Sequence, residues 1–181
     1  MIELNLRQVE YVQEIFRNTP QQVPKVVSRA INRSAHAARA QANRSVREHY
    51  NIKQRDVSST IKVRTASPDN LTASIRSSGE PLKLMTFRVS PNGPKKVKQV
   101  TVGVKKGSRK RIKGAFVTGM NSGHVNVFTR VTKKRLPIRG HYGPSVPQMI
   151  GNESVVSVVE NKAYDVLDKR LEHEINRLLR G

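Results

Sequence analysis

Residues 23–49 read VPKVVSRAINRSAHAARAQANRSVREH, and this stretch decides the fold. It contains six alanines and no glycine, and its apolar residues recur every three or four positions. That spacing places them on one face of a helix. The face consists of Val23, Val27, Ile31, Ala35, Ala38, Ala42 and Val46. The pattern therefore predicts a helix of roughly 25 residues with one buried side.

The same segment carries five arginines, and Glu48 is its one acidic residue. A run of charge on a helix usually forms a solvated polar face. A stripe that faces a partner protein or DNA is the alternative interpretation. The candidate stripe consists of Arg29, Arg33, Arg39, Arg44 and Arg47.

Helices are also expected on both sides of this segment. Val9, Val12, Ile15 and Phe16 have helical spacing and predict a short helix over residues 4–16, which ends before Pro20. At the other end, an apolar stripe from residue 155 to residue 179 predicts a long C-terminal helix. Acidic and basic residues alternate along that helix, so we expect it to pack on a sheet or on a neighbouring subunit.

The central part of the chain changes to β-branched, alternating sequence. Strand patterns occupy residues 61–65, 71–75, 100–104 and 125–131, and the breaks between them contain Pro, Gly, Asn and Asp. A hairpin is expected between residues 115–118 and 124–128, with its turn at 120–123. The fold class is thus α+β, with N-terminal helices, one of them long, a central antiparallel β-sheet and a long C-terminal helix.

Three regions follow from these changes: a helical region at 1–50, an antiparallel β region at 51–140, and a linker with the C-terminal helix at 141–181. The linker is too rich in Gly and Pro to be regular. A chain of 181 residues is long enough to bury a real core, and we expect one compact domain overall. Val, Leu, Ile and Phe make up 47 of the 181 residues, or about 26%. This fraction exceeds the roughly 20% below which a highly charged chain is disordered, so we expect the chain to fold.

Charge is the strongest functional signal in the sequence. The formal net charge is +21, and residues 81–152 hold 16 of the 34 Lys and Arg residues but no Asp or Glu. Such one-signed charge repels itself, which points to a polyanion or an acidic protein surface as the partner. Its densest part is residues 105–114, which we interpret as a mobile basic loop: a solvated loop, a phosphate-contacting loop or a loop that docks on acidic protein.

The candidate contact residues, for a partner protein or for DNA, lie in three clusters of this acid-free segment. They are Lys95, Lys96, Lys98, Lys105, Lys106, Arg109, Lys110, Arg111, Lys113, Lys133, Lys134 and Arg135.

Several classes of protein are disfavoured. Without cysteine the chain has no disulfide, thiolate metal site or Cys nucleophile. The five histidines, at 36, 49, 124, 141 and 173, are dispersed without metal-ligand spacing, and neither a Walker A sequence nor a G-x-S-x-G elbow is present. We therefore expect neither an enzyme nor a metal or other cofactor. No apolar run approaches membrane-spanning length and the N-terminus is unlike a signal peptide, so we expect no membrane contact and a reducing, soluble compartment.

Several segments together resemble the prophage minor tail protein Z family. They are residues 112–117 (IKGAFV), 122–130 (SGHVNVFTR), 135–138 (RLPI) and 143–149 (GPSVPQM), preceded by 28–35 (SRAINRSA), Ala38-Arg39 and 52–63. The resemblance spans roughly residues 23–152 in consistent order. It departs from the family at Lys113, where the family commonly has Pro.

The resemblance implies a virion structural protein of long-tailed phages, made in the host cytoplasm and assembled into the tail or neck. It implies a role in completing the head-proximal end of the tail and joining tail to head, as a homo-oligomeric ring, with a hexamer as the implied state. The implied partners are the tail terminator, tail tube and head–tail connector proteins, with possible contact to packaged DNA. The resemblance supplies no catalytic residues.

Composition alone favours a different function, a basic protein that coats or condenses nucleic acid without sequence preference. A sequence pI of about 11.1 with clustered cations is typical of such proteins. Aromatic residues are scarce and absent from the basic loop, which disfavours base-stacking readout of single strands or RNA.

Overall fold

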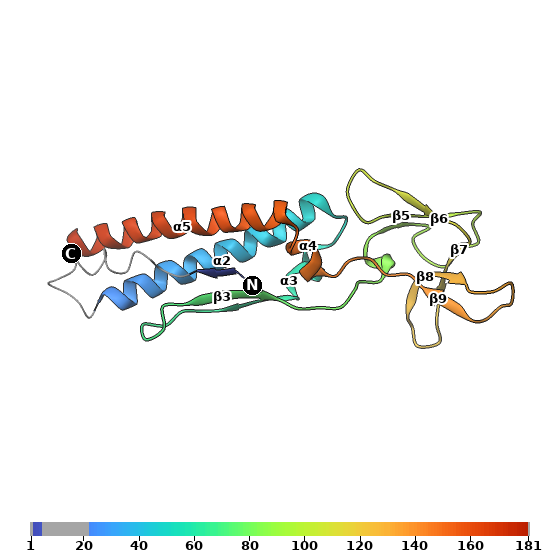
Figure 1. The fold of residues 1–181 in the computed structure, drawn as a ribbon, viewed down its shortest axis with the longest axis horizontal. Coiled ribbons are helices and arrows are strands. Elements are labelled where there is room, and N and C mark those ends of the chain that lie inside the picture. The colour runs from blue at the N-terminus through green and yellow to red at the C-terminus, as the bar shows by residue number, and fades with distance from the viewer. Residues whose placement is uncertain (1, 5–21, 181) are drawn as a thin grey trace.

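The computed structural model describes residues 2–4 and 22–180, and it shows an elongated α+β molecule (Figure 1). Helices α2 (Val23–His49) and α5 (Glu153–Arg180) lie side by side and form one half of its length. The short helices α3 (Gln54–Ser58) and α4 (Val146–Ile150) lie near the middle, and most of the strands form the other half. The predicted fold class is confirmed.

Helix α2 begins and ends where the sequence predicts. Pro24 stands in its first turn, where the missing N–H costs nothing, and no Gly interrupts the helix. All seven residues of the predicted stripe are buried. Four of the buried residues on α2 are alanines, at 30, 35, 38 and 42, and their short side chains leave room for close approach of another helix.

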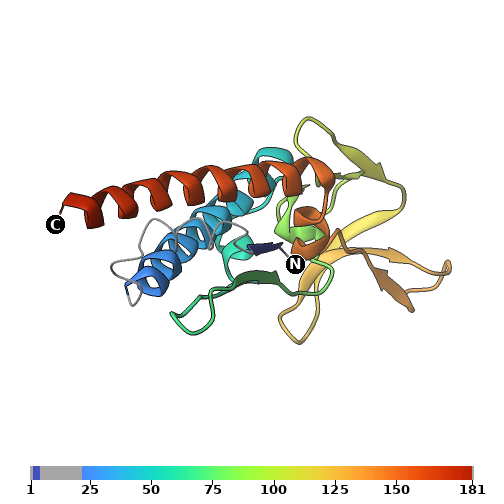
Figure 2. The same ribbon diagram turned by 60° about the vertical axis from the view of Figure 1, so that its left-hand side comes forward.

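Helix α5 fills that room. Its own buried residues are Val155, Val159, Ala163, Leu167 and Leu171, and the Ser34 hydroxyl of α2 donates a hydrogen bond to the carbonyl of Ala163. Both views of the ribbon show α5 running alongside α2 (Figures 1 and 2). Within the chain α5 packs mainly on the alanine face of α2 and not on a sheet, so that part of the expectation was wrong. The expected contact of α5 with a neighbouring subunit stays a prediction.

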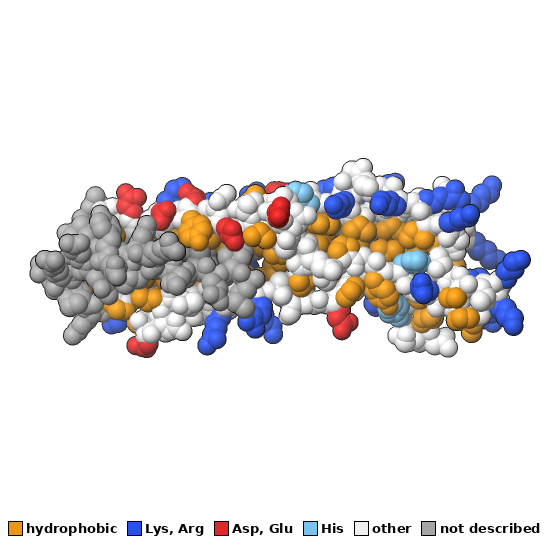
Figure 3. All heavy atoms as spheres, viewed as in Figure 1, with side chains coloured by type: hydrophobic (Ala, Val, Ile, Leu, Met, Phe, Trp, Pro, Cys, Tyr) orange, Lys and Arg blue, Asp and Glu red, His pale blue; other side chains and the backbone are white. Residues whose placement is uncertain are grey.

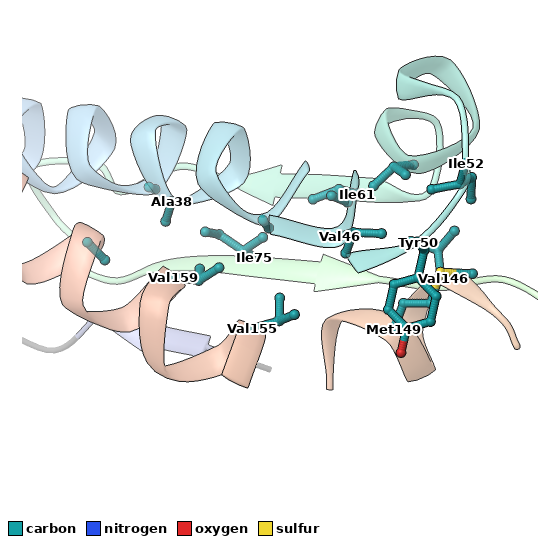
Figure 4. Close-up of a cluster of buried hydrophobic side chains, with 14 of the residues drawn as sticks. Ala38, Val46, Tyr50, Ile52, Ile61, Ile75, Val146, Met149, Val155 and Val159 are labelled. Atoms are coloured by element: carbon teal, nitrogen blue, oxygen red, sulfur yellow. The ribbon is translucent and has the colours of Figure 1, made fainter. Parts of the chain in front are cut away.

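The first sheet covers another side of α2. Its antiparallel order is β1-β3-β2, with β1 at Ile2–Leu4, β2 at Ile61–Arg64 and β3 at Ala73–Ser77. Ile75 of β3 lies between the two helices, near Val159 of α5 (Figure 4). The predicted N-terminal helix was wrong at Leu4, which belongs to β1, and its remaining residues lie outside the described part of the chain.

The expected β region is divided between this sheet and two further three-stranded antiparallel sheets. One has the order β4-β5-β6, with β4 at Arg88–Ser90, β5 at Val100–Gly103 and β6 at Lys110–Ile112. The other has the order β7-β8-β9, with β7 at Ala115–Gly119, β8 at Val125–Arg130 and β9 at Ile138–Gly140. The 3-10 turn η1 (Leu84–Thr86) precedes β4.

The predicted hairpin is confirmed in β7 and β8, which pair from Ala115↔Thr129 to Gly119↔Val125. Its turn is closed by the N–H of Met120, which donates to the carbonyl of His124 at 2.9 Å. Gly123 adopts a φ of +77° there, a conformation that glycine reaches without a steric penalty.

Two irregular segments of the prediction contain regular structure. Residues 110–112 of the expected loop form β6, because Ile112 pairs with the fully buried Val100 and packs against the core. Strand β9 ends at Gly140, directly before the expected linker, and within the linker Ser145 caps α4 with a capping box that it forms with Gln148. Side-chain packing and capping thus override the Gly and Pro content of both segments.

Overpacking of the interface between α2 and α5 should destabilise the protein. We expect Ala38→Leu to lower the free energy of unfolding by about 1–3 kcal/mol, because Ala38 is fully buried and a larger side chain forces its neighbours out of their rotamers. Urea unfolding at pH 7 measures the change. Ala40→Leu is the control, since Ala40 is exposed on the same helix and Ala and Leu have similar helix propensities. Equal losses in the two variants would contradict this account of the interface.

Candidate interaction surface

The twelve candidate cations of the β half form what we call the basic patch. They are Lys95, Lys96, Lys98, Lys105, Lys106, Arg109, Lys110, Arg111, Lys113, Lys133, Lys134 and Arg135, and all twelve are exposed. They lie in the β4–β5 loop, in the β5–β6 hairpin with the turn that follows it, and in the β8–β9 loop. Lys and Arg side chains cover the same end of the molecule in Figure 3.

The basic patch has no internal counter-charge. Its segment of the sequence contains no Asp or Glu. The ion pairs between described residues are all local pairs on α2, α3 and α5, and none includes a member of the patch. The full positive charge of this end therefore faces solvent or a partner.

The β5–β6 hairpin is attached to the end of α2. The N–H of Lys106 donates to the carbonyl of His49 at 2.9 Å, and the N–H of Asn51 donates to the carbonyl of Val104 at 2.9 Å. The Asn51 side-chain amide donates to the carbonyls of Gly103 and Lys105, at 2.9 and 3.1 Å. These bonds hold the base of the basic hairpin against the helix.

A cationic hollow of about 350 Å³ lies at this junction. Four of the side chains that line it are basic and none is acidic. The structure thus brings Arg47 of the predicted helix stripe together with Lys106 of the basic patch. Sequence reasoning missed the other two cations, Lys53 and Arg88, because they lie far apart in the chain and outside any dense cluster.

The five arginines of the predicted stripe have different surroundings within the chain. Arg39 is half-buried and its guanidinium lies 3.4 Å from the carbonyl of Ser58 in α3, and Arg44 pairs with Glu48 at 3.8 Å. Arg29 is exposed and Arg33 lines a groove between α2 and α5. Arg47 alone among the five lines the hollow shared with the basic patch.

An apolar cleft of about 450 Å³ adjoins the basic hairpin. Leu84, Val102, Val104 and Ile112 contribute its aliphatic surface, together with Tyr50 and Pro144, while Lys105, Ser108 and Lys110 contribute polar groups. In Figure 3, hydrophobic side chains gather on this face between β5 and β6 on one side and η1 on the other. The sequence signal for the cleft was the alternation Val100-Thr101-Val102-Gly103-Val104, which does not reveal that part of the apolar face stays open.

The groove between α2 and α5 has a volume of about 570 Å³ and a mixed charge. Its lining includes Arg33, Lys162, Arg170 and two histidines, His36 and His173, which lie far apart in the sequence. Asp165 in this groove receives hydrogen bonds from Lys169 at 2.7 Å and from Lys162 at 3.2 Å. The Lys169 bond and then the Lys162 bond hold the pKa of Asp165 below its ordinary value, and the same pairing raises the pKa of Lys169.

The described residues contain no group of three His, Cys, Asp or Glu side chains placed to hold a metal ion. Within residues 2–4 and 22–180, no helix has the length and apolar character needed to cross a membrane.

Comparison with protein families identifies the chain. The family model described as prophage minor tail protein Z (GPZ) matches residues 9–181, which is nearly the whole chain. The chain belongs to the prophage minor tail protein Z family. It is therefore a minor tail protein of a bacteriophage, a structural component of the virion. No curated protein and no solved structure matches it.

The family match confirms the resemblance seen in the sequence and extends it to the C-terminus. The residues matched include α2, the whole basic patch and α5. The basic patch and the apolar cleft beside it are the candidate contact sites of this minor tail protein.

Removing the Asp165 carboxylate should reduce the acid sensitivity of the fold. Because the pKa of Asp165 is lower in the folded protein than in the unfolded chain, its contribution to stability is present above the unfolded value and is lost as pH falls through the folded value. We expect Asp165→Asn to lower the urea midpoint slightly at pH 7, and we expect this difference to shrink as pH falls below the ordinary pKa of an aspartate and through the lower pKa of Asp165 in the folded protein. The effect is small because the carboxylate is solvent-screened.

The control for this measurement is Asp168→Asn, which removes an exposed carboxylate that forms no ion pair with a described residue. An identical pH dependence of the two variants would show that the Lys162 and Lys169 contacts of Asp165 do not contribute.

Proposed function

We propose that this minor tail protein completes the head-proximal end of the phage tail and helps join the tail to the head. We propose further that it does so as a closed ring, with six subunits to match the sixfold symmetry of the tail. Its membership of the prophage minor tail protein Z family carries the proposal. The proposed partners are the tail terminator, tail tube and head–tail connector proteins, met first in the host cytoplasm and then in the virion.

The distribution of charge supports an assembling subunit. Acidic residues of the described chain are concentrated on α5, which carries six of them, whereas the acid-free segment forms the opposite half of the molecule. In Figure 3 the acidic side chains lie over the helical half and the middle of this face, and Lys and Arg dominate the far end. A ring of identical subunits needs two different faces that complement each other, because each subunit contacts its neighbours head to tail.

The basic patch supports contact with a neighbour in the neck. Exposed cations without counter-ions raise the rate of encounter with acidic surfaces and disfavour wrong partners. Tail and connector surfaces of acidic character, or the DNA that passes between them, would supply the missing charge.

Neutralising the hairpin cations should impair assembly of the phage without destabilising the folded protein. We expect replacement of Lys105, Lys106, Arg109, Lys110, Arg111 and Lys113 by Gln to leave the urea midpoint within error, since all six are exposed, and to reduce the joining of tails to heads. Complementation of a phage that lacks the protein, scored by infective particles and by free tails in electron micrographs, measures the effect.

A matched control removes the same charge from the helical half. It replaces the exposed Lys25, Arg55, Lys62, Arg64, Arg76 and Arg177 by Gln, none of which lines the cationic hollow. Normal infectivity of the hairpin variant, or an equal loss in the control, would contradict the role proposed for this patch.

The assembly state distinguishes this proposal from its alternative. In roughly 0.5 M salt, where exposed charge pairs and phosphate contacts are strongly screened, we expect light scattering and electron microscopy to show a closed ring, alone or on added tail tubes. A monomer that does not bind to added tail tubes would contradict the proposed ring.

The alternative is a protein that coats DNA without sequence preference, and the cationic hollow formed by Arg47, Lys53, Arg88 and Lys106 favours it. In that case the protein binds duplex DNA with an affinity that falls steeply as salt rises. Such binding, combined with a monomeric state at high salt, would replace the tail-completion proposal.

A further inference from the structure

Strand β6 leaves one of its edges open. It is the last strand in the order β4-β5-β6, and its other edge pairs with β5 from Val100↔Ile112 to Val102↔Lys110. No described residue outside this ladder makes a hydrogen bond to the backbone of residues 110–112. An open edge offers backbone donors and acceptors to an added strand.

The apolar cleft lies directly beside this edge. Lys110 and Ile112 of β6 line it together with Val102 of β5 and Leu84 of η1. Residues 110 and 112 share one face of the strand, because successive side chains alternate between faces. A strand added to β6 would therefore place every second side chain over the cleft.

The charges around the edge define what such a strand must carry. Lys105 and Lys110 line the cleft, Arg111 projects from the strand, and Arg109 precedes it, all exposed. Cations on an edge strand repel another cationic edge, which is one way in which proteins prevent self-pairing. The same cations attract a strand whose side chains are acidic.

A second copy of this chain does not meet that requirement within its described residues. Their acidic residues lie on α2, α3 and α5, in Glu3 of β1, which is already paired with β3, and singly in loops at Asp69 and Glu80. None of these places offers an extended segment with two acidic side chains. The described part of a second copy thus offers no such segment, and charge complementarity favours a segment of another protein as the occupant.

We propose that an extended segment of a different protein, with alternating apolar and acidic residues, adds as a strand to the free edge of β6 and buries its apolar side chains in the cleft. The backbone of residues 110–112 supplies the hydrogen bonds, and Val102, Val104 and Ile112 supply the apolar contact. The acidic side chains alternate with the apolar ones and therefore face the other side of the sheet, where Arg109 and Arg111 pair with them. This inference rests on the proposed function, since it names the chemistry of one partner of the assembled tail.

A peptide of ten residues that alternates Val and Glu, capped at both ends and labelled with fluorescein, serves as the probe. Its binding to the full chain is followed by fluorescence anisotropy in about 0.15 M salt, where charge effects beyond about 8 Å are screened. We expect saturable binding of this peptide and none of the corresponding Val and Lys peptide.

Backbone methylation tests strand addition directly. Because alternate residues of a strand direct their N–H groups to opposite edges, N-methylation of all Val residues blocks one edge and N-methylation of all Glu residues blocks the other. We expect one of these two peptides to lose binding at least tenfold and the other to retain it. Equal affinities of the two would overturn strand addition.

Charge reversal tests the location. Arg109→Glu combined with Arg111→Glu should weaken binding of the Val and Glu peptide at least tenfold, because both arginines lie on the face that receives the acidic side chains. The control, Lys95→Glu combined with Lys96→Glu, makes the same change in net charge at exposed residues of the β4–β5 loop, outside strand β6, and should change the affinity less than threefold. Circular dichroism and urea midpoints verify that both variants fold.

Absence of binding at millimolar peptide, or equal loss in both charge-reversed variants, would overturn this inference. Ring formation and head joining are measured without the peptide, so a negative result here leaves the tail-completion proposal standing. Absence of peptide binding together with absence of ring formation and head joining would show that the basic end does not bind protein partners.

Discussion

The burial of the alanine face of α2 is the constraint on which the rest of the structure depends. α5 packs along this face, and Ile75 of β3 reaches between the two helices. Small side chains let the helices approach closely, and dense packing makes such an interface sensitive to added volume. With both long helices thus fixed, the β half is attached at one end of the pair and extends the molecule lengthwise.

This arrangement divides the molecule by charge as well as by structure. The helical half contains both signs and satisfies part of its charge in local ion pairs such as Lys169 with Asp165. In the β half, all Lys, Arg, Asp and Glu positions between residues 81 and 152 are Lys or Arg. Its two additional sheets bury Val100, Val102 and Val127 and place the basic residues on loops and on an edge strand. The fold therefore tolerates the repulsion by keeping these cations in water.

Periodicity alone predicted the elements with strong local signals. The limits of α2, its buried stripe, the long α5 and the β7–β8 hairpin were all predictable, because helix and hairpin patterns depend on residues close in sequence. The family was recognisable from ordered segments as well. The packing of α5 on α2 was not predictable, because an apolar stripe shows that one face of a helix is buried but does not indicate which element packs against that face.

Other features depend on contacts between distant residues and were missed for that reason. Strand β6 arises because Ile112 packs opposite Val100, although glycines and cations surround it in sequence. The hollow that joins Arg47 to Lys106 needs the α2 terminus and the β5–β6 hairpin to meet, and the apolar cleft needs η1 to lie across from β5. The cations that form the hollow are dispersed in the sequence, and the Val alternation of β5 is typical of any half-buried strand, so the sequence revealed neither feature.

The attachment of the basic hairpin to α2 has a mechanical consequence. The hydrogen bonds from Lys106 to His49 and from Asn51 to Val104 connect the hairpin backbone to the last residue of the helix and the chain just beyond it. A helix of 27 residues is a rod about 40 Å long. A force that acts on the hairpin is therefore transmitted through helix α2 to the opposite end of the subunit, and is not dissipated in a flexible loop.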